Sequence, residues 1–183
     1  MKPRLPEKGL TFFQPPQPLP EQRRELTGPF DIIGDLHGCA DELEALLRKL
    51  GYGPQGHPEK RRAIFLGDLT DRGPRNLDTY AIVSGMVKAA HALCVAGNHD
   101  ARLLRYLRGK NVTPTHGLQL TAAELARKDD TYREAMAECL DSLVSHYILD
   151  GGRLVVAHAG LRERYHGRTG RRVRAFCLYG DTT

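Results

Sequence analysis

Four short clusters of acidic, imidazole and amide residues, each anchored by glycine, follow one another along the chain. They are Gly34–Gly38, Gly67–Gly73, Gly97–Asp100 and Val155–Gly160. Carboxylate oxygens, imidazole nitrogens and amide oxygens bind divalent metal ions, and glycine lets the backbone turn sharply beside a ligand. The clusters therefore predict a centre with two metal ions that hydrolyses phosphoesters.

The candidate metal ligands are Asp35, His37, Asp68, Asn98 and His158. The first two lie two residues apart in a turn, where both side chains can reach one ion. We expect Asp68 to bridge, because one carboxylate can bind two cations about 3.5–4 Å apart. The last two would complete the coordination of the second ion. This set has no thiolate and favours Mn²⁺, although Fe²⁺, Zn²⁺, Co²⁺ and Ni²⁺ also fit.

Each cluster taken alone also has a structural explanation. Asp-x-His is a common pair, Gly-Asn-His can be a simple turn, and a histidine at the end of an apolar strand is usually a core residue. All four clusters occur here in order, and each follows an apolar run of strand length. The combination makes metal binding the better interpretation.

The apolar runs predict an α/β fold. The expected strands are Phe30–Ile33, Ala63–Leu66, Ala92–Ala96 and Arg153–Ala157. Ligands of such sheets bind at the carboxyl ends of the strands, where all four clusters lie. Leucines at helical spacing predict a helix that ends at Gly51, a second helix is expected over residues 76–90, and a helical insertion is expected between Leu118 and Ser145.

The motifs Gly-Asp-x-His-Gly, Gly-Asp-x-x-Asp-Arg-Gly and Gly-Asn-His-Asp resemble those of the calcineurin-like metallophosphoesterases. The resemblance is to the branch that holds the Ser/Thr phosphoprotein phosphatases and bacterial diadenosine tetraphosphatase. It implies a β-sandwich flanked by helices, with a helical insertion, and two bound divalent metal ions.

A narrower resemblance covers Asp31–Thr183. It includes Leu107–Val112, Thr115–Leu118, Leu143–Leu161 and Leu178–Thr183, and it points to the central phosphatase domain of bacterial polynucleotide kinase-phosphatase. That resemblance implies removal of 3′- and 2′-phosphates and opening of 2′,3′-cyclic phosphates on RNA 3′ ends in RNA repair, with a methyltransferase partner.

Two features expected from that resemblance are missing. The full-length family carries kinase and ligase domains, but no Gly-x-x-x-x-Gly-Lys-Ser/Thr loop occurs and no sequence follows Thr183. The family also has a downstream Gly-His-Thr segment whose histidine completes the second metal site, and the chain ends before it. We therefore expect a phosphoesterase domain that is incomplete at its C-terminus, which leaves the activity of this chain open.

The candidate catalytic residues lie within the same motifs. Arg72 can present a two-pronged donor to the substrate phosphate, which Asn98 would also contact. The resemblance implies that His99 protonates the leaving oxygen and that Asp71 orients and stabilises its ring. Asp100 is expected to be structural.

Composition favours a single domain with a phosphate-rich partner. The chain has 183 residues, of which 40% are hydrophobic, and a formal net charge of +5 with more arginine than lysine. Arg102, Arg105 and Arg108 share one helical face, and a second basic run covers Arg168–Arg174. Aromatic platforms for stacked bases are few, because tryptophan is absent.

Residues 1–28 hold most of the prolines and predict an extended, flexible arm or linker, with residues 29–183 forming the phosphoesterase domain. The cysteines predict neither a zinc site nor a disulfide framework, because no Cys-x-x-Cys pair occurs. There is no apolar leader and no run of the roughly 18 apolar residues that a membrane span needs, so we expect a cytoplasmic protein.

Two alternatives stay open. The chain could act on dinucleoside polyphosphates or phosphoproteins, as other members of the same branch do. It could instead be a catalytically weak fragment that binds metal and RNA. Substrate preference would distinguish an RNA-end phosphatase from an enzyme that acts on dinucleoside polyphosphates or phosphoproteins. The number of bound metal ions would distinguish either enzyme from the weak fragment.

Overall fold

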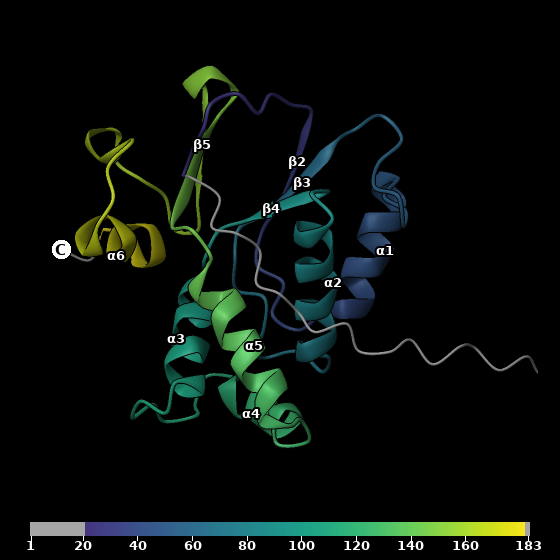
Figure 1. Ribbon diagram of the computed structural model, residues 1–183, viewed down its shortest axis with the longest axis vertical. Coiled ribbons are helices and arrows are strands. Elements are labelled where there is room, and N and C mark those ends of the chain that lie inside the picture. The colour runs from purple at the N-terminus through teal and green to yellow at the C-terminus, as the bar shows by residue number, and fades with distance from the viewer. Residues whose placement is uncertain (1–20, 182–183) are drawn as a thin grey trace, which may run out of the picture.

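The computed structural model describes residues 21–181, which contain two three-stranded sheets (Figure 1). The first sheet has the order β2-β3-β4 and is parallel, and the second has the order β1-β5-β6, with β1 parallel and β6 antiparallel to β5. The strands are Phe30–Ile33 (β2), Arg62–Phe65 (β3), Ala92–Cys94 (β4), Gln22–Arg23 (β1), His146–Leu149 (β5) and Leu154–Ala157 (β6).

The two sheets share a buried apolar layer. Ile64 of β3 and Leu93 of β4 pack in one cluster with Tyr147 of β5. Successive side chains of a strand point to opposite faces, so the neighbouring Phe65 and Cys94 belong instead to a larger cluster with the helices. Strands β3 and β4 are thus covered on both faces, which explains why their sequences are apolar without alternation.

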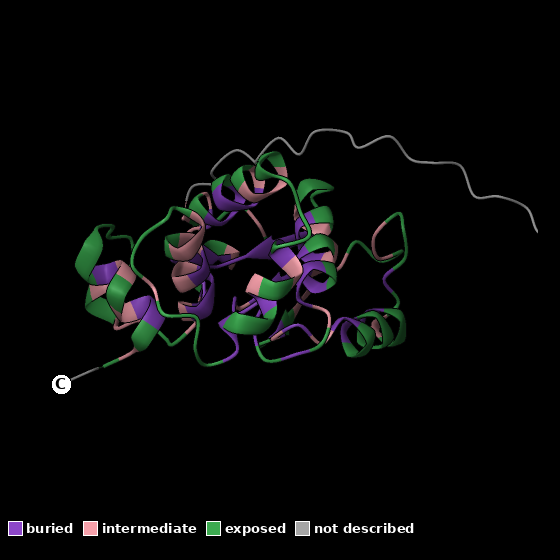
Figure 2. Ribbon diagram, turned by 90° about the horizontal axis from the view of Figure 1, so that it is seen from below, coloured by how far each residue is buried: buried purple, intermediate pink, exposed green. Residues whose placement is uncertain are grey.

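Helices cover the other face of the parallel sheet. Helices α1 and α2 pack together, as do α3 and α5, while α6 lies apart beyond β5 and β6 (Figure 1). Buried residues gather on the strands and the inner sides of the helices (Figure 2). The helices are Ala40–Leu50 (α1), Asn76–Lys88 (α2), Asn98–Leu107 (α3), Leu118–Leu125 (α4), Asp130–Asp141 (α5) and Arg171–Tyr179 (α6), with short 3₁₀ turns at Asp150–Gly152 (η1) and Glu163–Tyr165 (η2).

The predicted α/β sandwich is confirmed, and most of its elements begin and end near the expected residues. Strand β2 covers Phe30–Ile33 as predicted, and α1 ends before Gly51, whose φ of 94° suits a residue without a side chain. The expected insertion consists of two helices, because Asp129 Oδ1 accepts a hydrogen bond from Tyr132 N at 2.8 Å and starts α5 there. No helix among residues 21–181 combines the length and apolarity that crossing a bilayer requires.

The predicted arm, residues 1–28, falls largely on residues 1–20, which lie outside the described residues. In its remaining part, Gln22–Arg23 form β1 alongside Ile148 and Leu149 of β5. The edge of the second sheet is therefore built from a segment that precedes the first motif.

Glu124 of α4 ties the helical insertion to the start of α2. Its Oε1 accepts hydrogen bonds from Asn76 N at 2.9 Å and Asn76 Nδ2 at 2.7 Å, and its Oε2 accepts one from Leu77 N at 2.9 Å. The first N–H groups of a helix have no partner within it, and a carboxylate there also faces the positive end of the helix dipole. Glu124 thus caps a helix distant from it in sequence.

We expect Glu124→Ala to lower the free energy of unfolding by about 1–2 kcal/mol, because it removes this cap. Glu134→Ala, at an exposed position of α5, is the matched control and should change it by less than about 0.5 kcal/mol. Urea denaturation followed by circular dichroism measures both. Equal midpoints for the two variants would contradict the capping role.

Candidate metal centre

The predicted ligands come together where β2, β3, β4 and β6 end. Asp35 and His37 follow β2, Asp68 follows β3, Asn98 begins α3 just after β4, and His158 follows β6. In the parallel sheet, neighbouring strands run in the same direction, so their following loops share one edge. The second sheet contributes His158 to the same place.

Asp68 lies at the centre of this group. Its Oδ2 is 3.6 Å from His37 Nε2 and 3.7 Å from His158 Nε2, and only 2% of the residue is exposed. Its Oδ1 accepts a hydrogen bond from His99 N at 2.9 Å. One carboxylate oxygen is therefore flanked by two imidazole nitrogens from different sheets.

Both imidazoles are fixed from behind by backbone carbonyls. His37 Nδ1 lies 3.0 Å from Thr70 O, and His158 Nδ1 lies 2.8 Å from Leu66 O. A carbonyl oxygen only accepts, so in each ring Nδ1 carries the proton and Nε2 of the neutral ring presents a lone pair toward Asp68. This is the arrangement that orients metal-binding histidines.

The polar atoms left without donors fit bound cations. His37 Nε2 is buried and has no hydrogen-bond partner within residues 21–181. His158 Nε2 lies 2.8 Å from Asn98 Oδ1, which brings two acceptors together when Nδ1 carries the ring proton. A cation between them, or rotation of the amide, removes this repulsion. Since buried acceptors are rarely left unpaired, the donor set suits divalent metal ions.

Two overlapping sets of possible ligand atoms share Asp68. One set joins Asp68 with His37 and His99, the other joins it with Asp35 and His158, and the atoms of each set lie within 4.8 Å of one another. The predicted division instead placed Asp35 and His37 on one ion. Asp35 spans both sets, since its Oδ2 is 3.7 Å from His37 Nε2 and its Oδ1 is 3.7 Å from His158 Nδ1.

Glycines at 67 and 97 let the loops after β3 and β4 meet. A Cβ added to Gly67 would lie 2.2 Å from Gly97 N, and one added to Gly97 would lie 2.2 Å from Asp68 Oδ1. Both separations are far below any allowed contact. Any side chain at either position would push Asp68 out of place.

Four non-glycine residues of the site have left-handed backbone conformations. The φ angles are 45° for His37, 50° for Asp68, 74° for Asp71 and 66° for Arg72. Such conformations are uncommon for residues with a Cβ and cost free energy, so they persist only where other contacts impose them. Their concentration in these two loops marks a preorganised site.

Asp100 supplies part of that constraint. Its Oδ2 accepts hydrogen bonds from Gly97 N and Asp68 N at 2.8 Å each, and its Oδ1 accepts one from Leu69 N at 3.0 Å. Burial raises the pKa of Asp100 to about 6. The residue thus joins the two loops, in keeping with the structural role expected for it.

The predicted catalytic residues form a second group beside the first. His99 Nδ1 lies 2.7 Å from Asp71 Oδ2, and Arg72 Nη2 lies 3.1 Å from His99 Nε2. The hydrogen bond to Asp71 raises the pKa of His99 above its ordinary value, although burial opposes this. Arg72 is exposed, whereas His99 and Asp71 are buried, so the guanidinium lies at the mouth of the site.

Thr121 of α4 also belongs to this group, although it lies in none of the four motif clusters. Its hydroxyl donates to Asp71 Oδ1 at 2.6 Å and accepts from Asp71 N at 3.1 Å. Gly117, just before α4, packs on the loop as well, because a Cβ there would lie 2.4 Å from Arg72 N. The insertion therefore forms part of the site, although it supplies no metal ligand.

The family model for calcineurin-like phosphoesterases matches residues 28–179. The chain belongs to the calcineurin-like phosphoesterase family. Members of this family bind divalent metal ions, in agreement with the donor set around Asp68.

Curated relatives carry a specific name. Bis(5′-nucleosyl)-tetraphosphatase PrpE [asymmetrical] of Halalkalibacterium halodurans is 46% identical over 162 residues, and that of Bacillus subtilis is 44% identical over 162 residues. Each alignment covers 84% of this chain and 66% of the relative. The chain thus spans slightly less than two thirds of the length of these proteins.

Solved structures agree on the fold. A crystal structure provisionally assigned as a diadenosine tetraphosphatase has a TM-score of 0.59 and 26% sequence identity, with 84% of this chain and 60% of that chain covered. A cold-active protein-tyrosine phosphatase from a psychrophilic Shewanella has a TM-score of 0.62 at 15% identity, with 91% and 53% covered. The second likeness concerns the fold alone.

The expectation of an RNA-repair phosphatase was wrong, and with it that of RNA 3′ ends as the substrate. The methyltransferase partner was expected only from the same resemblance. The resemblance to polynucleotide kinase-phosphatase is not supported, because relatives 41–46% identical are tetraphosphatases. The prediction rested on motifs suited to metal ions and a phosphate group, and a phosphate group is common to RNA ends and nucleoside polyphosphates. An excess of arginine likewise favours any polyanion.

We expect the chain to bind two Mn²⁺ ions and Asp68→Asn to lose most of this binding, because both sets of ligand atoms depend on Asp68. Asp141→Asn, at an exposed position of α5, is the matched control and should still bind two. Metal content after equilibrium dialysis measures the stoichiometry, and circular dichroism checks folding. Two ions retained by folded Asp68→Asn would contradict the central position of this carboxylate.

Proposed function

We propose that this chain hydrolyses bis(5′-nucleosyl) tetraphosphates with the help of two divalent metal ions. The metal-dependent chemistry is proposed because Asp68 Oδ2 lies between the Nε2 atoms of His37 and His158. The substrate class rests on the tetraphosphatase relatives. We further propose that residues 29–183 form the body of this domain, to which Gln22–Arg23 add the edge strand of the second sheet.

In this proposal Asp35, His37, Asp68, Asn98 and His158 hold the ions. Divalent ions bound there would polarise phosphoryl oxygens and make hydroxide available near neutral pH. The nitrogen and oxygen donors favour Mn²⁺ over softer metals. The backbone carbonyls behind His37 and His158 keep both rings turned inward before any ligand arrives.

Arg72 binds the substrate phosphate in this scheme. Its exposed guanidinium can donate two parallel hydrogen bonds to phosphoryl oxygens. Arg72 Nη2 lies 3.1 Å from His99 Nε2, a contact that exists only while Nε2 is unprotonated, so the guanidinium turns to the phosphate when His99 carries the proton. Charge that develops on these oxygens during attack is stabilised by a donor already in place. The left-handed conformation of Arg72 places the side chain there at some cost in backbone free energy.

His99 acts as the general acid, positioned by Asp71. Water loses a proton to the solvent and forms the new bond to phosphorus, the anhydride P–O bond breaks, and the leaving phosphate oxygen takes the proton from His99 Nε2. His99 then regains a proton from the solvent, which restores the starting state. Asp71 accepts the hydrogen bond of His99 Nδ1 and is itself held by Thr121. Cleavage beside the first phosphate of a tetraphosphate yields a nucleoside monophosphate and a nucleoside triphosphate.

Hydrolysis of diadenosine tetraphosphate with Mn²⁺, followed by separation of the adenine nucleotides, tests the proposal. We expect equal amounts of AMP and ATP and no turnover by Asp68→Asn. A phosphopeptide offered at the same concentration should be hydrolysed more slowly. Release of ADP alone, or faster turnover of the phosphopeptide, would contradict the proposed reaction.

Thr121→Val should lower kcat for this substrate about tenfold. Valine has nearly the same shape as threonine but lacks the hydroxyl that donates a hydrogen bond to Asp71. Thr121→Ser keeps the hydroxyl and should remain within about twofold of the unchanged chain. Steady-state kinetics with matched Mn²⁺ content measures both. If the valine and serine variants turned over alike, Thr121 would have no part in positioning Asp71.

A further inference from the structure

A cavity of about 230 Å³ lies between α6 and the segment around η2. We call it the α6 cavity and define it by Arg164, Tyr165, Arg172, Phe176 and Tyr179. Arg172, Phe176 and Tyr179 are spaced at four and three residues and thus share one face of α6. The cavity combines cationic and aromatic side chains in a small volume.

The aromatic and guanidinium groups of the cavity are stacked on one another. The Tyr165 and Phe176 rings meet edge to face with centroids 5.6 Å apart. The Arg164 guanidinium carbon lies 5.0 Å from the Tyr165 centroid, and that of Arg162 lies 5.3 Å from the Phe176 centroid. Such contacts preorganise flat groups that can accept a further flat ring.

The cavity also carries positive charge that is not neutralised locally. Arg162 forms an ion pair with Asp181, but neither Arg164 nor Arg172 pairs with a carboxylate within residues 21–181. Partial burial raises the pKa of the Tyr165 hydroxyl, yet the hydrogen bond from Arg164 and the charges of the surrounding arginines outweigh it and lower that pKa overall. The fitting ligand is therefore an anion with a flat ring.

The C-terminal part of α6 contacts Ala159, the residue that follows His158. Ala159 N donates a hydrogen bond to Cys177 O of α6 at 2.7 Å. Gly180, at the rim of the cavity, approaches Ala159 O, since a Cβ added there would lie 3.7 Å from it. Val173 and Cys177, on the other side of α6, are buried and hold the helix in place.

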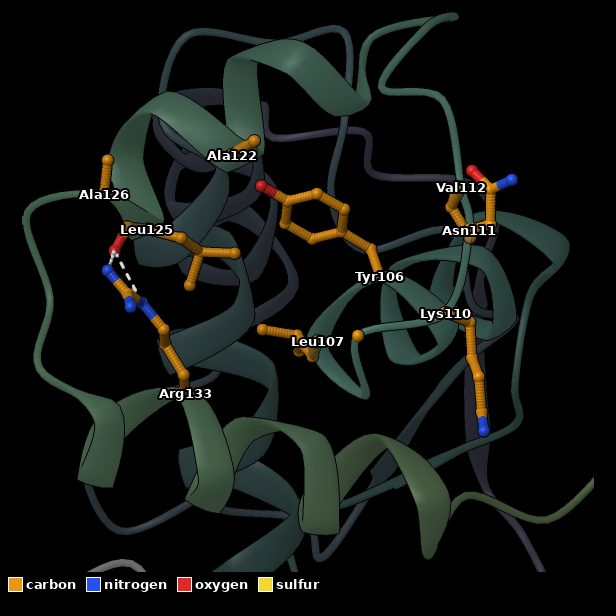
Figure 3. Close-up of a pocket in the computed structure, with 10 residues that line it drawn as sticks. Tyr106, Leu107, Lys110, Asn111, Val112, Ala122, Leu125, Ala126 and Arg133 are labelled. Carbon is orange, nitrogen blue, oxygen red and sulfur yellow. Dashed lines mark hydrogen bonds between the residues drawn. The ribbon is translucent and has the colours of Figure 1, made fainter.

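A larger cavity, of about 530 Å³ between α3, α4 and α5, fits such a ligand less well (Figure 3). Its interior is lined by Tyr106, Leu107 and Leu125, whereas Lys110 extends away from it (Figure 3). Arg133 is occupied, because its Nε and Nη2 donate to Leu125 O at 3.2 and 3.0 Å. That cavity offers no free cation facing inward for a phosphate.

We propose that the α6 cavity binds the nucleotide end of the tetraphosphate that lies away from the metal ions. The base stacks on the aromatic groups of Tyr165, Phe176 and Tyr179, and its phosphate pairs with Arg164 and Arg172. This rests on the proposed function, and it assigns the substrate's second nucleotide a site that none of the metal motifs provides. Base stacking on aromatic side chains tolerates different bases, so the cavity accepts nucleotides without strong base preference.

Calorimetric titration with AMP in the presence of a chelator tests the cavity without the metal centre. We expect Arg172→Gln and Tyr179→Ala each to weaken AMP binding about tenfold. Arg171→Gln, the neighbouring exposed arginine outside the cavity, should leave it unchanged. No AMP binding by the unchanged chain, or equal binding by all variants, would overturn the proposal.

Kinetics with diadenosine tetraphosphate separates this inference from the proposed function. Arg172→Gln should raise KM about tenfold with kcat unchanged, and leave hydrolysis of p-nitrophenyl phosphate as it is. Unchanged KM in a chain that cleaves the tetraphosphate would overturn the cavity assignment alone. The chain could also bind AMP in a way that depends on Arg172 and yet have no tetraphosphatase activity. That outcome would support the cavity as a nucleotide site and overturn the proposed reaction.

Discussion

The carboxylate of Asp68 is the point at which the loops of this molecule meet. Its Oδ2 faces one imidazole from the parallel sheet and one from the second sheet, and its Oδ1 holds the first turn of α3 through His99 N. A buried carboxylate facing lone pairs is unfavourable unless a cation joins them. The fold therefore holds a negative charge and several lone pairs close together, in an arrangement that bound divalent metal ions would stabilise.

Holding that carboxylate in place requires features that would otherwise destabilise the chain. Left-handed backbone at Asp68 and Asp71 is strained, and the glycines at 67 and 97 increase the entropy that folding must overcome. Hydrogen bonds offset part of this cost. Asp100 accepts three from backbone N–H groups, and the Thr121 hydroxyl bonds to both the carboxylate and the backbone N–H of Asp71. Their contacts explain why α3 and α4 belong to the site as much as the strands do.

The sequence predicts the sandwich and the grouping of the metal motifs because both follow from local patterns: an apolar strand, then glycine, then a ligand. Thr121 could not be predicted, since it meets Asp71 across 50 residues of sequence and belongs to no motif. The substrate class was predicted wrongly for a related reason. The roles predicted for Asp35 and Arg72 concern metal ions and a phosphate group, which substrates of several classes share, so the motifs do not distinguish one phosphate ester from another.

Anomalous diffraction from crystals grown with Mn²⁺ tests the central claim most directly. We expect two manganese peaks that share Asp68, with His37 Nε2 bound to one ion and His158 Nε2 to the other. One peak only, or two peaks with no contact to Asp68, would contradict it, because the carboxylate would then not be the group that joins the two halves of the site.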